Sequence, residues 1–189
     1  MKDTVSNTEE NFFDAANKNI SPEGQSAMQG KKWTPKDGTH AHQYYELAVE
    51  DALDQTAKSN GACREVYSEM TNSAGTLDTY IRRGEKGIVI DYKTHDMTEW
   101  PQADALREGK KQGEQVLRYL TAICKDENIL AQHIHGYVIH TGKPPNDMQV
   151  LNAYRSELND HNIGLAPCKD GDAKSVVNAV KKLVNKHSI

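Results

Sequence analysis

The sequence predicts an α/β domain in which helices flank a mixed β-sheet, and two observations carry this prediction. Segments with apolar residues at helical spacing alternate with short runs rich in β-branched residues. Their order is helix, three strands, helix, strand, helix, strand, helix, which is typical of an α/β sandwich. A tight turn at Arg83–Gly87 separates the second and third strands, so these two are expected to form an antiparallel hairpin at the centre of the sheet.

The first half of the chain supplies one helix and three strands. The helix covers about His40–Lys58, because Tyr45, Val49 and Leu53 form an apolar stripe at helical spacing. Three β-rich segments follow, and the last of them is the most strongly β-branched. The expected strands are residues 63–71, Leu77–Arg82 and Ile88–Lys93.

The second half alternates helices with strands. A long helix starts after Pro101, a residue that suits the first turn of a helix. Asp172 can cap the final helix, whose apolar stripe includes Val176, Val180 and Val184. The remaining expected elements are a strand at about Ile134–Thr141, a helix at about Asp147–Leu158 and a short strand at Ile163–Ala166.

Residues 1–39 differ in composition from the rest of the chain. They are rich in Asn, Ser, Thr, Glu and Lys and show no sustained apolar period. We expect them to form a loosely ordered leader or linker, and residues 40–189 to form one domain. A chain of 189 residues is long enough for a single domain with a substantial core.

Composition narrows the classes of function. The formal net charge of −4 and the isoelectric point near 6.1 argue against a protein that binds duplex nucleic acid through bulk positive charge. There are three cysteines and no two lie close together, so neither a disulfide framework nor a cysteine-based zinc site is expected. No apolar run approaches the roughly 20 residues of a membrane span, and no signal peptide is visible.

Charged residues end the third predicted strand. Asp91 and Lys93 share one face with Val89, and leaving these charges unpaired in a buried strand would cost on the order of several kcal/mol. Either a divalent cation or an ion pair would compensate them. Asp78 lies thirteen positions before Asp91, and the hairpin folds it back toward Asp91, so two carboxylates converge. This convergence favours a hard cation such as Mg²⁺, with Lys93 placed to assist metal-dependent hydrolysis.

Asp78, the hairpin and the triplet Asp91-Tyr92-Lys93 resemble the core of the PD-(D/E)XK nucleases, although Leu77 rather than proline precedes Asp78. The resemblance implies a restriction-endonuclease-like fold. It implies that Asp78, Asp91 and the backbone carbonyl of Tyr92 bind Mg²⁺ or Mn²⁺. It also implies that Lys93 assists the nucleophilic water.

The same resemblance, which spans about residues 40–142, assigns roles on two helices. Glu46 matches a glutamate that the first helix of this family often contributes to the metal site, and Glu50, one turn on, is the alternative. Gln115 and Tyr119 have the QxxxY form found in the exonuclease-like branch and in related bacterial toxin nucleases. This motif implies that Gln115 hydrogen-bonds the lysine or a substrate phosphate beside Tyr119, and that Gln112 shares their helix face.

Histidines and lysines supply weaker signals. Two His-x-His pairs occur, His40 with His42 and His133 with His135. No third ligand completes a zinc pattern, so structural or surface roles are favoured for both pairs. His95, two positions after Lys93, is better placed to contact substrate. Lys110 and Lys111 precede Gln115 and are candidate phosphate contacts, although such clusters are more often solvated helix faces.

The expected function is a metal-dependent nuclease that hydrolyses phosphodiester bonds. DNA is the favoured substrate, and RNA, including tRNA, is the alternative. A catalytic unit behind a loose leader also resembles the toxins of bacterial competition systems. That resemblance implies delivery within a larger toxin, action in the cytoplasm of a target cell and inhibition by a cognate immunity protein. Two other classes stay open: a non-catalytic module that binds nucleic acid or protein, and a histidine-based metal-binding protein.

Overall fold

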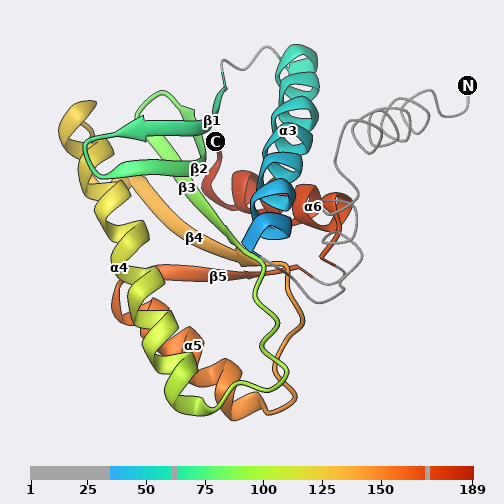
Figure 1. Ribbon diagram of the computed structural model, residues 1–189. Coiled ribbons are helices and arrows are strands. Elements are labelled where there is room, and N and C mark those ends of the chain that lie inside the picture. Colours follow the sequence, from blue (N-terminus) through green and yellow to red (C-terminus); the bar gives the residue numbers. More distant parts are fainter. Residues whose placement is uncertain (1–34, 61–63, 169–170) are drawn as a thin grey trace, which may run out of the picture.

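The computed structural model describes residues 35–60, 64–168 and 171–189 (Figure 1). Residues 1–34 of the expected leader lie outside the described residues. The elements are α3 (Pro35–Asn60), β1 (Glu65–Asn72), β2 (Gly75–Arg83), β3 (Lys86–Lys93), α4 (Gln102–Asp126), η1 (Ala131–His133), β4 (Ile134–His140), α5 (Met148–Asp160), β5 (Ile163–Pro167) and α6 (Ala173–His187).

The strands form one five-stranded sheet in the order β1-β2-β3-β4-β5. The pairs β1–β2 and β2–β3 are antiparallel, whereas β3–β4 and β4–β5 are parallel. Short turns join the antiparallel strands, and α4 and α5 provide the crossovers that parallel strands require. The predicted α/β architecture with a mixed sheet flanked by helices is therefore confirmed, as is the predicted order of elements.

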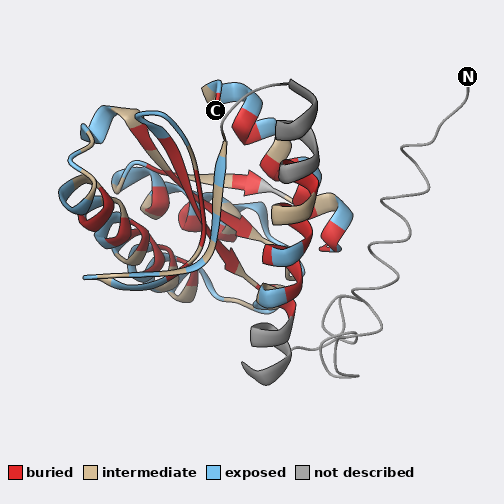
Figure 2. Ribbon diagram, turned by 90° about the horizontal axis from the view of Figure 1, so that it is seen from above, coloured by how far each residue is buried: buried red, intermediate tan, exposed pale blue. Residues whose placement is uncertain are grey.

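Two hydrophobic cores sandwich the sheet. One lies between the sheet and the helices α3 and α6, and the other lies between the sheet and the helices α4 and α5 (Figure 1). In the view from above, the buried residues gather on the helix faces that are turned toward the sheet (Figure 2). The central strand β3 is covered on both sides, and six of its eight residues are buried. This double coverage explains why its sequence is a continuous apolar run rather than an alternating one.

The predicted boundaries hold for most elements, and the first helix is the largest exception. It begins at Pro35 rather than near His40 and runs to Asn60. Asp172 caps α6 as predicted, since its side chain accepts a hydrogen bond from the backbone N–H of Ser175 at 2.7 Å. None of the helices within the described residues is long and apolar enough to span a membrane.

Candidate active site

The site lies where the β2–β3 ladder opens. The last paired residues of this ladder are Thr79 and Ile90, and the same register continued by one step would place Asp78 opposite Asp91. Instead, the Asp78 carboxylate accepts a hydrogen bond from the backbone N–H of Tyr92, at 2.7 Å between Oδ2 and N. A side chain thus takes the place of a main-chain acceptor at the point where the two strands separate.

Asp91 and Lys93 lie side by side on the face of β3 that is turned toward α4. Lys93 Nζ is 2.6 Å from Asp91 Oδ2, and the two side chains are only 14% and 2% exposed. Apart from this ion pair, Asp91 Oδ2 accepts no hydrogen bond from the described residues. The strand alternation that predicted a shared face for these two residues therefore produces direct contact between them.

The QxxxY motif on α4 extends the contacts of Lys93. Lys93 Nζ donates to Gln115 Oε1 at 3.5 Å, and Gln115 Nε2 donates to the hydroxyl of Tyr119 at 3.0 Å. The Tyr119 hydroxyl in turn donates to the backbone carbonyl of Thr76 on β2 at 2.7 Å. This chain of hydrogen bonds ties the lysine to two elements, which restricts the positions that its ammonium group can take.

Helix α3 brings a third acid to the opposite side of the opening. Glu46 is 4% exposed, and burial followed by repulsion from Asp78 raises its pKa to about 9. The alternative acid, Glu50, instead accepts a hydrogen bond from the hydroxyl of Ser68 on β1 at 3.2 Å. Glu46 is therefore the helix acid that faces the candidate site, and its role as a metal ligand stays a prediction.

His42, which the sequence named only in a His-x-His pair with a favoured structural or surface role, is a neighbour of the site. Its Nδ1 lies 3.5 Å from Asp78 Oδ2, and burial is the main reason that its pKa is lowered to about 4. The ring is therefore neutral at neutral pH and does not add a positive charge to the site. His42 and Glu46 are four positions apart on α3, so helical spacing was the one signal that linked them.

Burial is the main cause that raises the pKa values of the acids of the site. Burial raises the pKa of Asp78 to about 6, and burial together with repulsion from Asp78 raises the pKa of Asp91 to about 6. Burial opposes the charge on Lys93, but attraction by Asp91 and Asp78 outweighs it and raises the pKa of this lysine. The site therefore holds a protonated lysine among carboxyl groups that resist ionisation.

The donor set fits a hard divalent cation. Among the described residues, no three His, Cys, Asp or Glu side chains form a group that could hold a metal ion. Mg²⁺ does not require such a group, because one or two carboxylates commonly hold it while it keeps several waters. Asp78 and Asp91 meet that lower requirement, and a cation would relieve the repulsion between the two acids. The Tyr92 carbonyl stays a predicted ligand.

Other residues singled out in the sequence lie away from this cluster. Gln112 is buried and accepts a hydrogen bond from Tyr154 on α5, so it joins two helices rather than contacting Lys93. His135 stacks on His187 of α6, with ring centroids 4.0 Å apart. The side chain of His40 lies outside the described residues. The described structure thus gives no support to a histidine-based metal centre.

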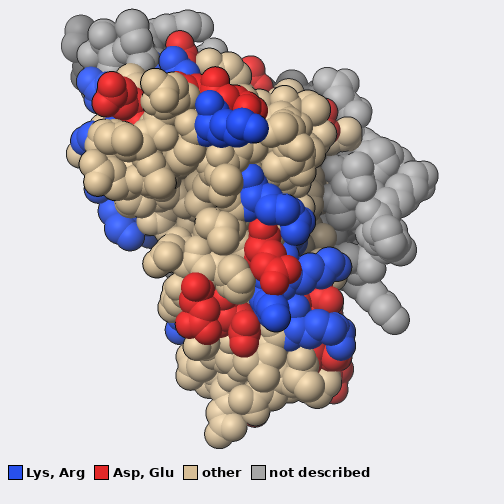
Figure 3. Space-filling model, turned by 90° about the vertical axis from the view of Figure 1, so that its left-hand side faces the viewer, with Lys and Arg blue, Asp and Glu red and all other residues tan. Residues whose placement is uncertain are grey.

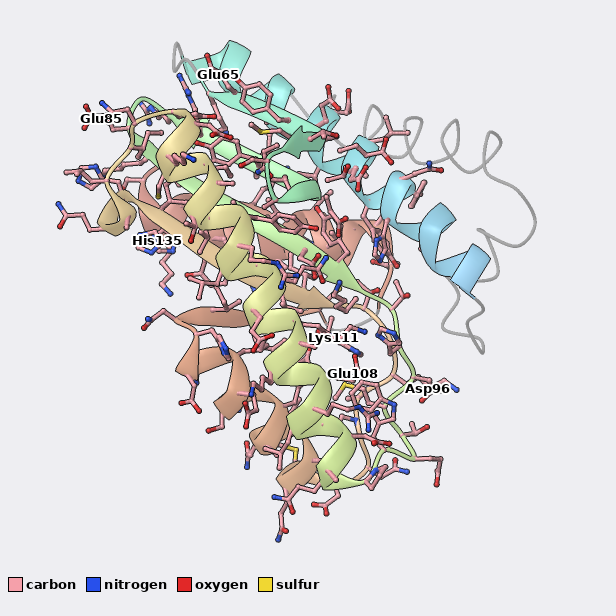
Figure 4. The ribbon with its side chains drawn as sticks, turned by 60° about the vertical axis from the view of Figure 1, so that its left-hand side comes forward. Glu65, Glu85, Asp96, Glu108, Lys111 and His135 are labelled. Carbon is pink, nitrogen blue, oxygen red and sulfur yellow. The ribbon has the colours of Figure 1, made fainter. Side chains whose placement is uncertain are left out.

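The surface over α4 carries charges of both signs. Figure 3 shows blue and red side chains interleaved on this side of the molecule rather than one basic field. Lys111 Nζ lies 3.7 Å from Glu108, and Figure 4 shows both side chains at the edge of α4 that faces the loop of Asp96. Lys143 Nζ is 3.6 Å from Asp96. Lys111 and Lys143 are therefore each paired with an acid.

A comparison with solved structures finds a distant similarity. The solved structure of SfsA from Pyrococcus furiosus in complex with Ca²⁺ is similar at 14% identity, with a TM-score of 0.38, over 68% of this chain and 56% of that chain. No protein-family model matches the chain. No curated protein matches it significantly. A likeness this distant carries no argument about activity, so the function has to be argued from the site itself.

Proposed function

We propose that this protein is a metal-dependent nuclease that hydrolyses phosphodiester bonds. The observation that carries the proposal is the meeting of Asp78, Asp91 and Lys93 at the open end of one hairpin, with Lys93 held by both Asp91 and Gln115. The order of elements, a helix, an antiparallel hairpin and then a parallel strand, also agrees with the fold that the PD-(D/E)XK resemblance implies.

Each side chain has a task that its surroundings support. Asp78, Asp91 and the Tyr92 carbonyl would hold Mg²⁺ or Mn²⁺, with Glu46 as a further ligand, and the bound ion would supply Lewis acidity and an activated water. Because the pKa of Lys93 is raised, its ammonium group donates hydrogen bonds and stabilises negative charge at the phosphate rather than acting as a base. Gln115 keeps that ammonium group directed into the site.

A comparison of substrates and variants tests this proposal. We expect the wild type to cleave plasmid DNA with Mg²⁺ or Mn²⁺ and to stop when EDTA is added, whereas Asp91→Ala and Lys93→Ala are inactive. The matched controls are Asp126→Ala and Lys125→Ala, because this acid and this base are exposed at the end of α4. Both controls should keep the wild-type rate. Metal-dependent cleavage of neither plasmid DNA nor tRNA would overturn the proposal.

DNA is the substrate we favour, and tRNA is the alternative that the same assay measures. Cleavage of tRNA but not of plasmid DNA would support a nuclease whose substrate is RNA. Binding of either nucleic acid without cleavage would favour the non-catalytic module instead. Melting curves of the inactive variants show whether the loss of cleavage comes from the site or from loss of the fold.

We further propose that the nuclease acts as an antibacterial toxin in the cytoplasm of a target cell and that a cognate immunity protein inhibits it. The support is the resemblance to toxin nucleases through Gln115 and Tyr119, which hydrogen-bond each other on α4. Expression of the wild-type chain in bacteria should stop growth, and expression of the Asp91→Ala variant should not. Normal growth of bacteria that express the wild type or the Asp91→Ala variant, at matched protein levels, would contradict the toxin role. The proposal of nuclease activity would still stand.

A further inference from the structure

A pocket of about 390 Å³ lies at the carboxyl ends of β4 and β5, beneath α5. Its walls are mainly apolar, and its polar lining comes from His140 at the end of β4 and Arg155 on α5. Ligands of open α/β sheets commonly bind outside the carboxyl ends of the strands. The pocket is thus placed where the fold itself favours a ligand.

The pocket adjoins the candidate active site. His140 is the residue of β4 that pairs with Lys93 in the parallel register, so their side chains lie on the same face of the sheet. Neighbouring strands are about 4.8 Å apart. Two backbone hydrogen bonds tie the flanking loops together, from Thr141 N to Lys93 O at 2.8 Å and from Met97 N to Lys143 O at 3.0 Å. The pocket therefore lies one strand away from Lys93.

His140 lines this pocket and carries a ring nitrogen that has no partner. Its Nε2 is buried and makes no hydrogen bond to any of the described residues. Burial lowers the pKa of the ring to about 4, so the ring is neutral at neutral pH. A buried polar atom without a hydrogen-bond partner is unusual in a folded protein.

The rest of the lining matches a flat heterocycle with polar edges. Met97, Leu151, Leu165 and the ring of Tyr154 supply apolar walls. The exposed Arg155 at the pocket brings a fork of N–H donors, and its hydrogen bond to Asn152 is long, at 3.4 Å. Arginine donors match the O6 and N7 acceptors of guanine. Guanine carries both N–H donors and ring acceptors, so it can supply the hydrogen-bond partner that His140 Nε2 lacks.

We propose that this pocket binds one nucleobase of the substrate, with guanine preferred, while the adjacent phosphate lies at Asp91 and Lys93. The pocket would make the nuclease selective for a base that is out of the stack, because a base reaches such a pocket only from a single strand or after flipping. This inference rests on the proposed function for the position of the phosphate, but its binding test does not depend on cleavage.

The test measures binding of GMP, AMP, CMP and UMP to the full chain in EDTA by titration calorimetry. GMP should bind about tenfold more tightly than UMP, the size of one specific pair of base contacts. His140→Phe, which keeps a flat ring but removes both ring nitrogens, and Leu151→Trp, which fills the pocket, should each abolish that preference. Leu130→Trp is the matched control, because Leu130 is 62% exposed and does not line the pocket.

The outcomes separate this inference from the proposed nuclease. Equal affinity for the four nucleotides, no binding of GMP, or an unchanged preference in both pocket variants overturns the base pocket, whether or not the wild type cleaves DNA. A GMP preference that both pocket variants lose supports it, even if the wild type cleaves nothing. His140 Nε2 has no hydrogen-bond partner among the described residues of the folded protein, so His140→Phe should melt close to the wild type. Leu151→Trp fills the pocket without changing His140, so it tests the pocket by a second route.

Discussion

The two ends of the β2–β3 hairpin differ in how deeply their ion pairs are buried. At the turn end, Arg82 lies 2.7 Å from both Glu65 and Glu127, and the three side chains are 31%, 49% and 18% exposed. At the open end, Lys93 pairs with Asp91 at 2.6 Å, and these side chains are 14% and 2% exposed. One hairpin thus has a hydrated ion-pair network at one end and a buried one at the other.

The difference lies in how well each network satisfies its charges. At the turn end, Arg82 has two acidic partners, and its pKa is raised, chiefly by the hydrogen bond to Glu127. At the open end, Lys93 attracts Asp91 and Asp78, while Asp78 repels Glu46. Burial raises the pKa of all three acids. A buried, imperfectly compensated cluster opposes stability, so its presence points to chemistry rather than to folding.

The largest expected contrast between the two ends is in cleavage rate. Lys93→Met should lower metal-dependent cleavage of plasmid DNA by about 10²–10³-fold, because the developing charge on the phosphate loses its donor. Arg82→Met, the same change at the turn end, should leave the rate close to wild type. Initial rates at saturating metal measure both, and equal losses in the two variants would contradict the assignment of chemistry to the open end.

The next largest contrast is in the stability of the metal-free protein. The folded pKa of Glu46, about 9, lies above its ordinary value of 4.5, so its protonated form stabilises the native state. That contribution is complete below pH 4.5 and is lost as pH rises toward 9, on the order of a few kcal/mol. Glu46→Gln mimics the protonated acid and should flatten this slope in urea melts taken between pH 5 and 9. An unchanged slope would show that Glu46 ionises freely.

Metal binding should depend on pH at the open end. Asp78 and Asp91 have pKa values of about 6, and carboxylate ligands must lose their protons before they hold a cation. The apparent affinity for Mn²⁺ should therefore fall below pH 6 by up to about tenfold per pH unit for each of the two acids. Calorimetry in two buffers of different ionisation enthalpy should also show that Mn²⁺ binding releases protons near pH 6. An affinity that is flat from pH 5 to pH 7 would argue against these two acids as ligands.

The smallest expected effect is on stability at the turn end. Arg82→Met should lower the free energy of unfolding by about 1 kcal/mol or less, since its partners are partly exposed and remain hydrated. High salt should reduce the difference further. Urea melts at 0.05 and 1 M NaCl check this. A larger loss that salt does not change would mean that the turn-end network is more buried in solution than its exposure indicates.

Much of the fold and part of the site follow from local patterns. Apolar periodicity predicts each helix and strand because burial of one face needs side chains at a fixed spacing. Asp78 and Asp91 come together because a hairpin turn places the residues before it opposite those after it. The two residues are only thirteen positions apart in the sequence, so a local turn is enough to bring them together. The hydrogen bond between Gln115 and Tyr119 follows from their separation by one helical turn.

The sequence by itself determined the order of elements, the hairpin with Asp78 and Asp91, and the shared face of Asp91 and Lys93. Only the tertiary structure decided that α3 brings His42 and Glu46 to Asp78, and that β4 lies beside β3 with His140 next to Lys93. The physical reason is the distance along the chain between the residues that make each contact. Helix and strand periodicity follows from neighbours along the chain, whereas those two contacts depend on how separate apolar faces pack against one sheet.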